Sequence, residues 1–144
     1  MAALRLFWFI RLKRVHIICS MGEIEIRVRY AETDQMGFLH HANFLIYFEM
    51  GRVELLRSRG LNYKDMEAQG YLLVIARAQV RYHRPARYDD VLLLRTHVVR
   101  ATGARIDHRY ELLRHDELIA EGETTLACVD RDGRLQRIPE MLRE

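Results

Sequence analysis

The chain has 144 residues, of which 49% are hydrophobic and 30% are charged, a composition typical of one globular domain and too apolar for a disordered chain. Four of its 23 basic residues and none of its 20 acidic residues lie in residues 1–20, so residues 21–144 carry a net charge of −1. The basic residues are interleaved with acids, which argues against the concentrated basic face of a nucleic-acid-binding protein. The two cysteines, Cys19 and Cys128, form no CxxC motif, which disfavours a zinc site. We therefore expect a cytoplasmic location, where thiols stay reduced.

Residues 1–20 form a separate segment whose two apolar stretches, 6–10 and 15–19, are interrupted by Arg11, Lys13 and Arg14. A signal peptide needs an apolar run of about 7–15 residues, and a membrane span needs about 20. Neither is present, and an amphipathic segment on a membrane surface is the alternative interpretation. We expect a poorly ordered N-terminal extension at 1–20, followed by a single domain at 21–144.

The first predicted strand covers residues 23–30, where Ile24, Ile26, Val28 and Tyr30 alternate with charged side chains. A polar, glycine-bearing segment follows at 31–41. Residues 43–57 are then apolar on most sides and rich in helix formers, with a glycine at position 60 to end the helix. Because a helix that is apolar nearly all round is usually buried, we expect a sheet wrapped around this helix.

The remaining chain is predicted to contain a short helix and several strands. Asn62 is expected to cap a helix that runs to residue 69 and ends at Gly70. Strands are expected at 71–83, 91–100, 104–115 and 118–130. Short turns separate the last three strands, so they should be antiparallel neighbours.

The segment between the first strand and the long helix carries the most informative chemistry. Asp34 lies in a loop seven residues before the helix, and Gly37 permits a tight reversal between them. A helix N-terminus exposes unpaired N–H groups and a partial positive charge, which stabilise an oxyanion. The sequence therefore places a carboxylate close to a group that can polarise a carbonyl. In isolation, an ordinary turn or cap residue is the more common role of an aspartate such as Asp34.

Residues 33–37 (TDQMG) and 41–44 (HANF), with Tyr47 and Glu49 in the helix, resemble the acyl-CoA thioesterases of the 4-hydroxybenzoyl-CoA thioesterase-like group. Residues 84–90 are similar to the connection between the second and third strands of that family. The resemblance covers residues 22 to about 140. It implies an α+β hotdog fold, in which an antiparallel sheet wraps around a long central helix, and hydrolysis of acyl-CoA thioesters.

The resemblance also implies roles for individual residues. Asp34 would act as general base toward water or as nucleophile through an anhydride, and the sequence does not choose between them. The backbone N–H of His41 would polarise the thioester carbonyl, while its side chain could orient Asp34, water or substrate. Glu49 is the alternative base, unless it pairs with Arg52 or forms a hydrogen bond back to the loop. His40 is expected to be a solvated loop residue.

Substrate binding is assigned to Tyr30 and Asn43, and to arginines that would hold the coenzyme A phosphates. Arg100 and Arg105 flank the turn at 102–103 and are the first choice, reaching the substrate across a subunit boundary. The alternatives are Arg84 and Arg87. Any of the four could instead be an ordinary surface arginine.

The resemblance implies no metal or redox cofactor, and an acyl-CoA substrate. We expect a homodimer or homotetramer, because one chain leaves a sheet edge and one side of the cleft incomplete. Two other functions stay open: a hotdog hydratase or dehydratase, and a non-catalytic module that binds acyl-CoA or acyl carrier protein. The sequence leaves open the acyl group, the choice between coenzyme A and acyl carrier protein as the carrier, and the number of subunits.

Overall fold

The computed structural model describes residues 20–143, and the expected N-terminal extension lies outside them except for its last residue. The elements, in chain order, are β1 (Ser20–Arg27), η1 (Tyr30–Glu32), α1 (Ala42–Ser58), α2 (Tyr63–Ala68), β2 (Leu72–Tyr82), β3 (Val91–Ala101), β4 (Ile106–Arg114), β5 (Glu117–Val129), β6 (Leu135–Gln136) and η2 (Glu140–Leu142). The helix and strand predictions are therefore confirmed to within a few residues at most boundaries. The short strand β6 was not predicted.

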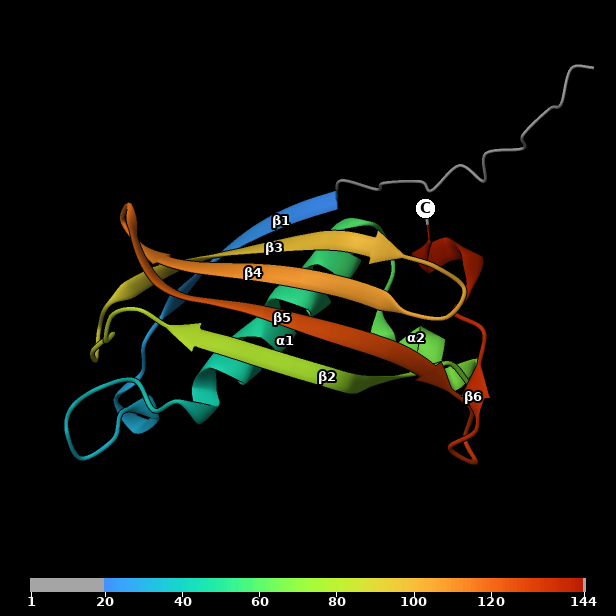
Figure 1. Cartoon of the computed structure of the whole chain (residues 1–144), viewed down its shortest axis with the longest axis horizontal. Helices are drawn as coiled ribbons and strands as arrows, with labels where there is room; N and C mark the ends of the chain where they lie inside the picture. The colour runs from blue at the N-terminus through green and yellow to red at the C-terminus, as the bar shows by residue number, and fades with distance from the viewer. Residues whose placement is uncertain (1–19, 144) are drawn as a thin grey trace, which may run out of the picture.

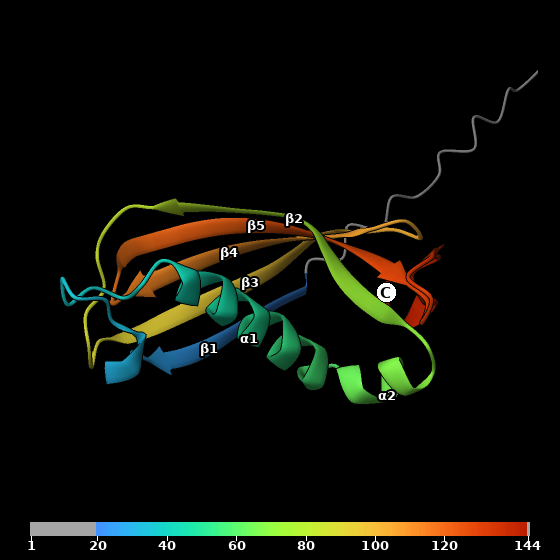
Figure 2. The same cartoon turned by 90° about the horizontal axis from the view of Figure 1, so that it is seen from below.

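The strands form one antiparallel sheet in the order β1-β3-β4-β5-β2, and β6 pairs with β5. The strands β3, β4 and β5 are neighbours, as their short connecting turns predict. Figures 1 and 2 show the sheet curving over one side of α1. This is the arrangement expected for an α+β hotdog fold.

The helix α1 buries only one of its faces, which corrects the expectation of burial nearly all round. Its buried side chains include Phe44, Tyr47 and Phe48, which face the sheet. The opposite face exposes Leu45, Ile46 and Met50, each by more than 40%. A single curved sheet covers one side of a helix, so the apolar residues on the other side stay exposed in this chain.

The core lies between α1 and the sheet. The Phe48 ring stacks on Tyr110 of β4, with 4.4 Å between centroids. Gly122 of β5 leaves the space that this ring needs, because a Cβ at this position would collide with it. Such close packing fixes the rotation of α1 relative to the sheet, and therefore the position of its N-terminus.

The helix ends follow the sequence signals. Asn62 accepts a hydrogen bond from the backbone N–H of Asp65 and so caps α2. Gly60 and Gly70 follow the two helices with φ values of 76° and 89°, which glycine adopts without strain.

The strand β1 ends earlier than its sequence alternation predicts. Its last ladder pair joins Arg27 to Val91, the first residue of β3, so no partner strand extends further. Tyr30 instead begins the 3₁₀ turn η1 and is 79% exposed, rather than sharing the buried face of Val28.

Candidate active site

The loop between η1 and α1 is a tight hairpin that presents Asp34. Thr33 and Leu39 form a β-bridge, and the Asp34 N–H donates to the Phe38 carbonyl at 2.8 Å. Gly37 lies between them at a φ of 79° and donates to the Asp34 carbonyl. The loop is therefore held by its own backbone, as the glycine at this position suggested.

The Asp34 carboxylate has one anchored oxygen and one available oxygen. Its Oδ1 accepts hydrogen bonds from the backbone N–H groups of Met36 at 2.9 Å and Phe38 at 3.2 Å. Its Oδ2 accepts no hydrogen bond from residues 20–143, and the side chain lines an open groove. A carboxylate held in this way can accept a proton from water or attack a carbonyl carbon.

The backbone N–H of His41 has no hydrogen-bond acceptor within the described part of the chain. The preceding carbonyl, of His40, accepts from the Asn43 N–H at 2.9 Å and so points toward α1. Because a trans peptide is planar, the His41 N–H points the opposite way, out from the helix N-terminus. His41 also lines the groove that Asp34 lines. The site therefore combines a carboxylate with a free, dipole-assisted donor.

The groove has a volume of about 390 Å³ and a mainly apolar wall. Phe44 at the start of α1 packs edge-to-face on Tyr82 at the end of β2, with 4.9 Å between ring centroids. The Tyr82 hydroxyl donates to the His41 carbonyl at 3.3 Å and so links the strand to the helix N-terminus. The sequence analysis missed Tyr82 as a site residue, because nothing in the strand pattern distinguishes its last residue.

The two histidines before α1 have different positions from those expected. His40 is half-buried, and its Nδ1 accepts from the Ala42 N–H at 3.2 Å, so it caps the helix rather than being merely solvated. The His41 ring stacks on His40 at 4.1 Å and makes no hydrogen bond to Asp34 within the described residues. An orienting role for the His41 side chain toward water or substrate stays a prediction.

Glu32 is a buried acid beside the site that the sequence analysis did not single out. It is only 6% exposed, and its carboxylate accepts from Arg29 and from the Tyr47 hydroxyl. Asn43 donates through Nδ2 to the Glu32 carbonyl at 2.9 Å, so its side chain binds the loop. We name Arg29, Glu32, Asn43 and Tyr47 the Glu32 cluster. Its partners are up to 15 residues apart in sequence, so no local motif marks it.

The other predicted substrate-binding residues, Tyr30, Arg100 and Arg105, do not line the groove of Asp34. Tyr30 packs edge-to-face on Tyr88 and does not line the groove. Arg100 and Arg105 flank the β3–β4 turn, at the opposite end of the sheet from the Asp34 loop (Figure 1), and Arg105 pairs with Asp107.

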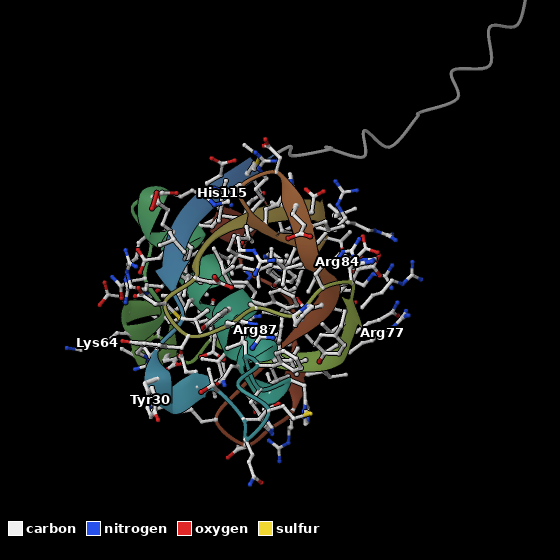
Figure 3. The ribbon with its side chains drawn as sticks, turned by 90° about the vertical axis from the view of Figure 1, so that its left-hand side faces the viewer. Tyr30, Lys64, Arg77, Arg84, Arg87 and His115 are labelled. Atoms are coloured by element: carbon white, nitrogen blue, oxygen red, sulfur yellow. The ribbon has the colours of Figure 1, made fainter. Side chains whose placement is uncertain are left out.

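The alternative arginines lie at the end of the molecule that carries the Asp34 loop. Figure 3 looks at this end and shows Arg84 and Arg87 on it, with Tyr30 at its margin. Arg84 lines the groove and pairs with Glu117 at 3.5 Å. Arg87 lies over the Phe38 ring at 4.6 Å.

The alternative base, Glu49, is exposed on α1, with a side-chain accessibility of 69%. It pairs with Arg52 at 3.8 Å, as one of the sequence interpretations expected. It was expected inside an apolar helix, and it is exposed because α1 buries only one face. Glu49 does not line the groove of Asp34.

A second buried polar group, the Arg52 cluster, consists of Arg52, Thr96, His108 and Tyr110. Arg52 donates through Nη1 to the Tyr110 hydroxyl at 3.3 Å. The Arg52 Nε, Thr96 Oγ1 and His108 Nδ1 have no hydrogen-bond partner among residues 20–143. The neighbouring cavity has a volume of about 30 Å³, which is enough for a water molecule but far too small for a thioester.

Within residues 20–143, no helix is long and apolar enough to cross a membrane. The same residues contain no group of three or more His, Cys, Asp and Glu side chains that could hold a metal ion.

The sheet around one helix, with a carboxylate loop before that helix, matches the class that the sequence resemblance implied, the hotdog-fold thioesterases. The model of the Thioesterase-like superfamily matches residues 28–144. The chain is 32% identical over 106 residues to the acyl-CoA thioesterase YbgC of Haemophilus influenzae, covering 73% of this chain and 78% of that protein. It is 29% identical over 106 residues to the acyl-CoA thioester hydrolase YbgC of Escherichia coli, covering 73% and 79%.

Solved structures agree with this relationship. The DHNA-CoA thioesterase from Staphylococcus aureus is 32% identical, with a TM-score of 0.77 over 82% of this chain and 79% of that chain. The chain therefore belongs to the Thioesterase-like superfamily and has the hotdog fold.

Proposed function

We propose that this protein hydrolyses acyl-CoA thioesters to the free acid and coenzyme A, in the groove between the Asp34 loop and the N-terminus of α1. The observation that carries the proposal is a carboxylate with one free oxygen in the same groove as His41, whose N–H is unpaired among the described residues. The relatives named acyl-CoA thioesterases support the substrate class.

The proposed reaction has two possible first steps, both at Asp34. As a general base, the carboxylate accepts a proton from water, whose oxygen attacks the thioester carbon. As a nucleophile, it attacks that carbon itself, and water then hydrolyses the anhydride. In either case the carbonyl oxygen becomes an oxyanion that accepts from the His41 N–H, and the C–S bond breaks to release the coenzyme A thiolate. Losing one such donor typically raises a barrier by about 2.7–4 kcal/mol.

A thiol-release assay over a panel of aliphatic and aromatic acyl-CoA thioesters tests the proposal. Release of one thiol per acid formed supports hydrolysis and gives the acyl preference. Hydration of an enoyl-CoA without thiol release would instead support a hydratase. Tight acyl-CoA binding without turnover would support a binding module. Acyl carrier protein thioesters in the same panel decide the carrier.

We further infer that the active form is a homodimer or homotetramer in the cytoplasm. Most residues of the edge strand β2 are exposed, including Val74 and Ile75. An unprotected strand edge with apolar side chains favours pairing with another chain. The exposed Leu45, Ile46 and Met50 on α1 add further apolar surface. Sedimentation at micromolar concentration should give a dimer or larger, whereas an active 17.1 kDa monomer would contradict the inference.

A further inference from the structure

The Glu32 carboxylate is bound more completely than any role in the 3₁₀ turn requires. Its Oε2 accepts from the Arg29 N–H at 2.8 Å and from the Tyr47 hydroxyl at 2.7 Å. Its Oε1 accepts from the Arg29 guanidinium at 3.0 and 2.7 Å. The carboxylate thus joins the end of the β1 segment to the second turn of α1.

The carbonyl of the same residue binds the other side of the catalytic loop. It accepts from the His40 N–H at 2.9 Å and from Asn43 Nδ2 at 2.9 Å. These bonds close the base of the hairpin that begins at Thr33 and returns at Leu39. Asp34 lies two residues after Glu32 on one strand of the hairpin, and His41 lies one residue after His40 on the other.

The charge of Glu32 matters for these contacts. Burial raises its pKa, but the hydrogen bonds from Arg29 and Tyr47 outweigh burial, so that the pKa lies below its usual value. At neutral pH the carboxylate is ionised, and both oxygens act only as acceptors. A glutamine has the same shape, but its amide nitrogen would face a donor of Arg29 in either orientation, the guanidinium at the Oε1 position or the backbone N–H at the Oε2 position.

We propose that Glu32 is a positioning residue for the reaction: the six hydrogen bonds that it accepts set the distance between the Asp34 carboxylate and the His41 N–H. The proposal rests on the proposed thioesterase function. Glu32 does not line the groove and so touches no substrate. A displacement of about 1 Å in a reacting group can lower the rate by about 10²-fold. Loss of the Glu32 charge should therefore affect turnover more than substrate binding.

The test is Glu32→Gln, compared with Glu54→Gln, which changes an exposed acid at the far end of α1. We expect Glu32→Gln to lower kcat by about 10- to 100-fold, with KM within about 3-fold and the oligomeric state retained. The kcat loss should be equal for an acyl-CoA and for the same acyl group on a short thiol, because Glu32 does not contact the coenzyme. Glu54→Gln should behave as the wild type.

Two outcomes would overturn the proposal: kcat of Glu32→Gln within about 3-fold of Glu54→Gln, or a loss confined to KM. If Glu32→Gln does not fold, Arg29→Met decides, because it removes two donors from Oε1 through a side chain that is 76% exposed. A lowered kcat with unchanged KM supports the proposal, and an unchanged kcat overturns it. A wild-type protein that releases no thiol would instead contradict the proposed function.

Discussion

The two halves of α1 each carry a buried polar cluster, and the clusters differ in how completely they are bonded. At the N-terminal half, every carboxylate oxygen of Glu32 has two donors. At the C-terminal half, Arg52 of α1, Thr96 of β3 and His108 of β4 each have a buried polar atom without a partner among the described residues. The first cluster adjoins a groove of about 390 Å³, and the second adjoins a cavity of about 30 Å³.

We interpret the difference as one of role: the Glu32 cluster serves catalysis and the Arg52 cluster serves packing. A fully bonded polar network rigidifies what it touches, and the Glu32 cluster touches the loop of Asp34 and the first turns of α1. The Arg52 cluster also contains a strongly perturbed group, but it has no space for a thioester. Burial lowers the pKa of His108 to about 3, with a further contribution from the charge of Arg52. A perturbed pKa therefore does not locate the site here.

The largest expected effect concerns stability in acid through His108. Its pKa is about 3 when folded and 6.5 ordinarily, so between these values the unfolded chain binds a proton that the folded chain does not. The free energy of unfolding therefore loses nothing to His108 above about pH 6.5. Below that pH it decreases by about 1.4 kcal/mol per pH unit. At pH 4.5 the loss is about 2–3 kcal/mol, or about 5–10 °C in Tm.

Melting curves of the wild type and His108→Gln at pH 7 and pH 4.5 measure this contribution. The Tm of the variant should fall less between the two pH values, because glutamine does not titrate. Groups that titrate in both proteins, Glu32 among them, cancel in the comparison. Equal drops in Tm would show that His108 is not held neutral.

A matched pair of hydroxyl deletions, Tyr47→Phe and Tyr110→Phe, tests the comparison directly. Each removes one buried hydroxyl: Tyr47 donates to Glu32, and Tyr110 bonds to Arg52 and Thr124. Both should lower the free energy of unfolding by about 1 kcal/mol. Only Tyr47→Phe should lower kcat, by about 3- to 10-fold, because only the Glu32 cluster holds the site. Equal kcat values for the two variants would remove the functional distinction between the clusters.

The smallest expected effect is on KM. It shows which of the two arginine pairs, at opposite ends of the sheet, binds the coenzyme A phosphates. We expect Arg100→Ala with Arg105→Ala to raise KM for an acyl-CoA about 3- to 10-fold with little change in kcat, since the proposed contacts, made across a subunit boundary, are remote from the reacting carbon. KM for a short-thiol ester should not change. If only Arg84→Ala with Arg87→Ala has this effect, the phosphates bind at the Asp34 end of the sheet, and the assignment to Arg100 and Arg105 is wrong.

The sequence predicts the sheet and helices well, because their signals are local. In β4, Ile106, His108, Tyr110 and Leu112 are buried as their alternation requires. Asn62 caps α2 by accepting a hydrogen bond from the N–H of Asp65, only three residues later in the sequence. The alternation pattern wrongly assigns Tyr30 to the first strand. The end of β1 depends on where its partner β3 begins, and local alternation carries no information on that point.

The site was predictable only as far as its motif is contiguous. Asp34, Gly37 and His41 lie within eight residues, and the structure brings Asp34 and His41 to one groove. Glu32 and Tyr82 were missed because their partners come from distant parts of the chain. Glu49 was expected in an apolar surrounding because the sequence of α1 does not show which face the sheet covers.

The most direct test of the central claim is the turnover number of Asp34→Asn, measured beside Glu49→Gln with the best substrate of the acyl-CoA panel. Asparagine keeps the shape of the loop residue but can neither accept the proton nor form the anhydride. We predict a loss of at least about 10²-fold in kcat for Asp34→Asn, with folding retained, and a much smaller change for Glu49→Gln. Near-normal turnover in Asp34→Asn, with a large loss in Glu49→Gln, would contradict the account and assign the chemistry to the helix carboxylate.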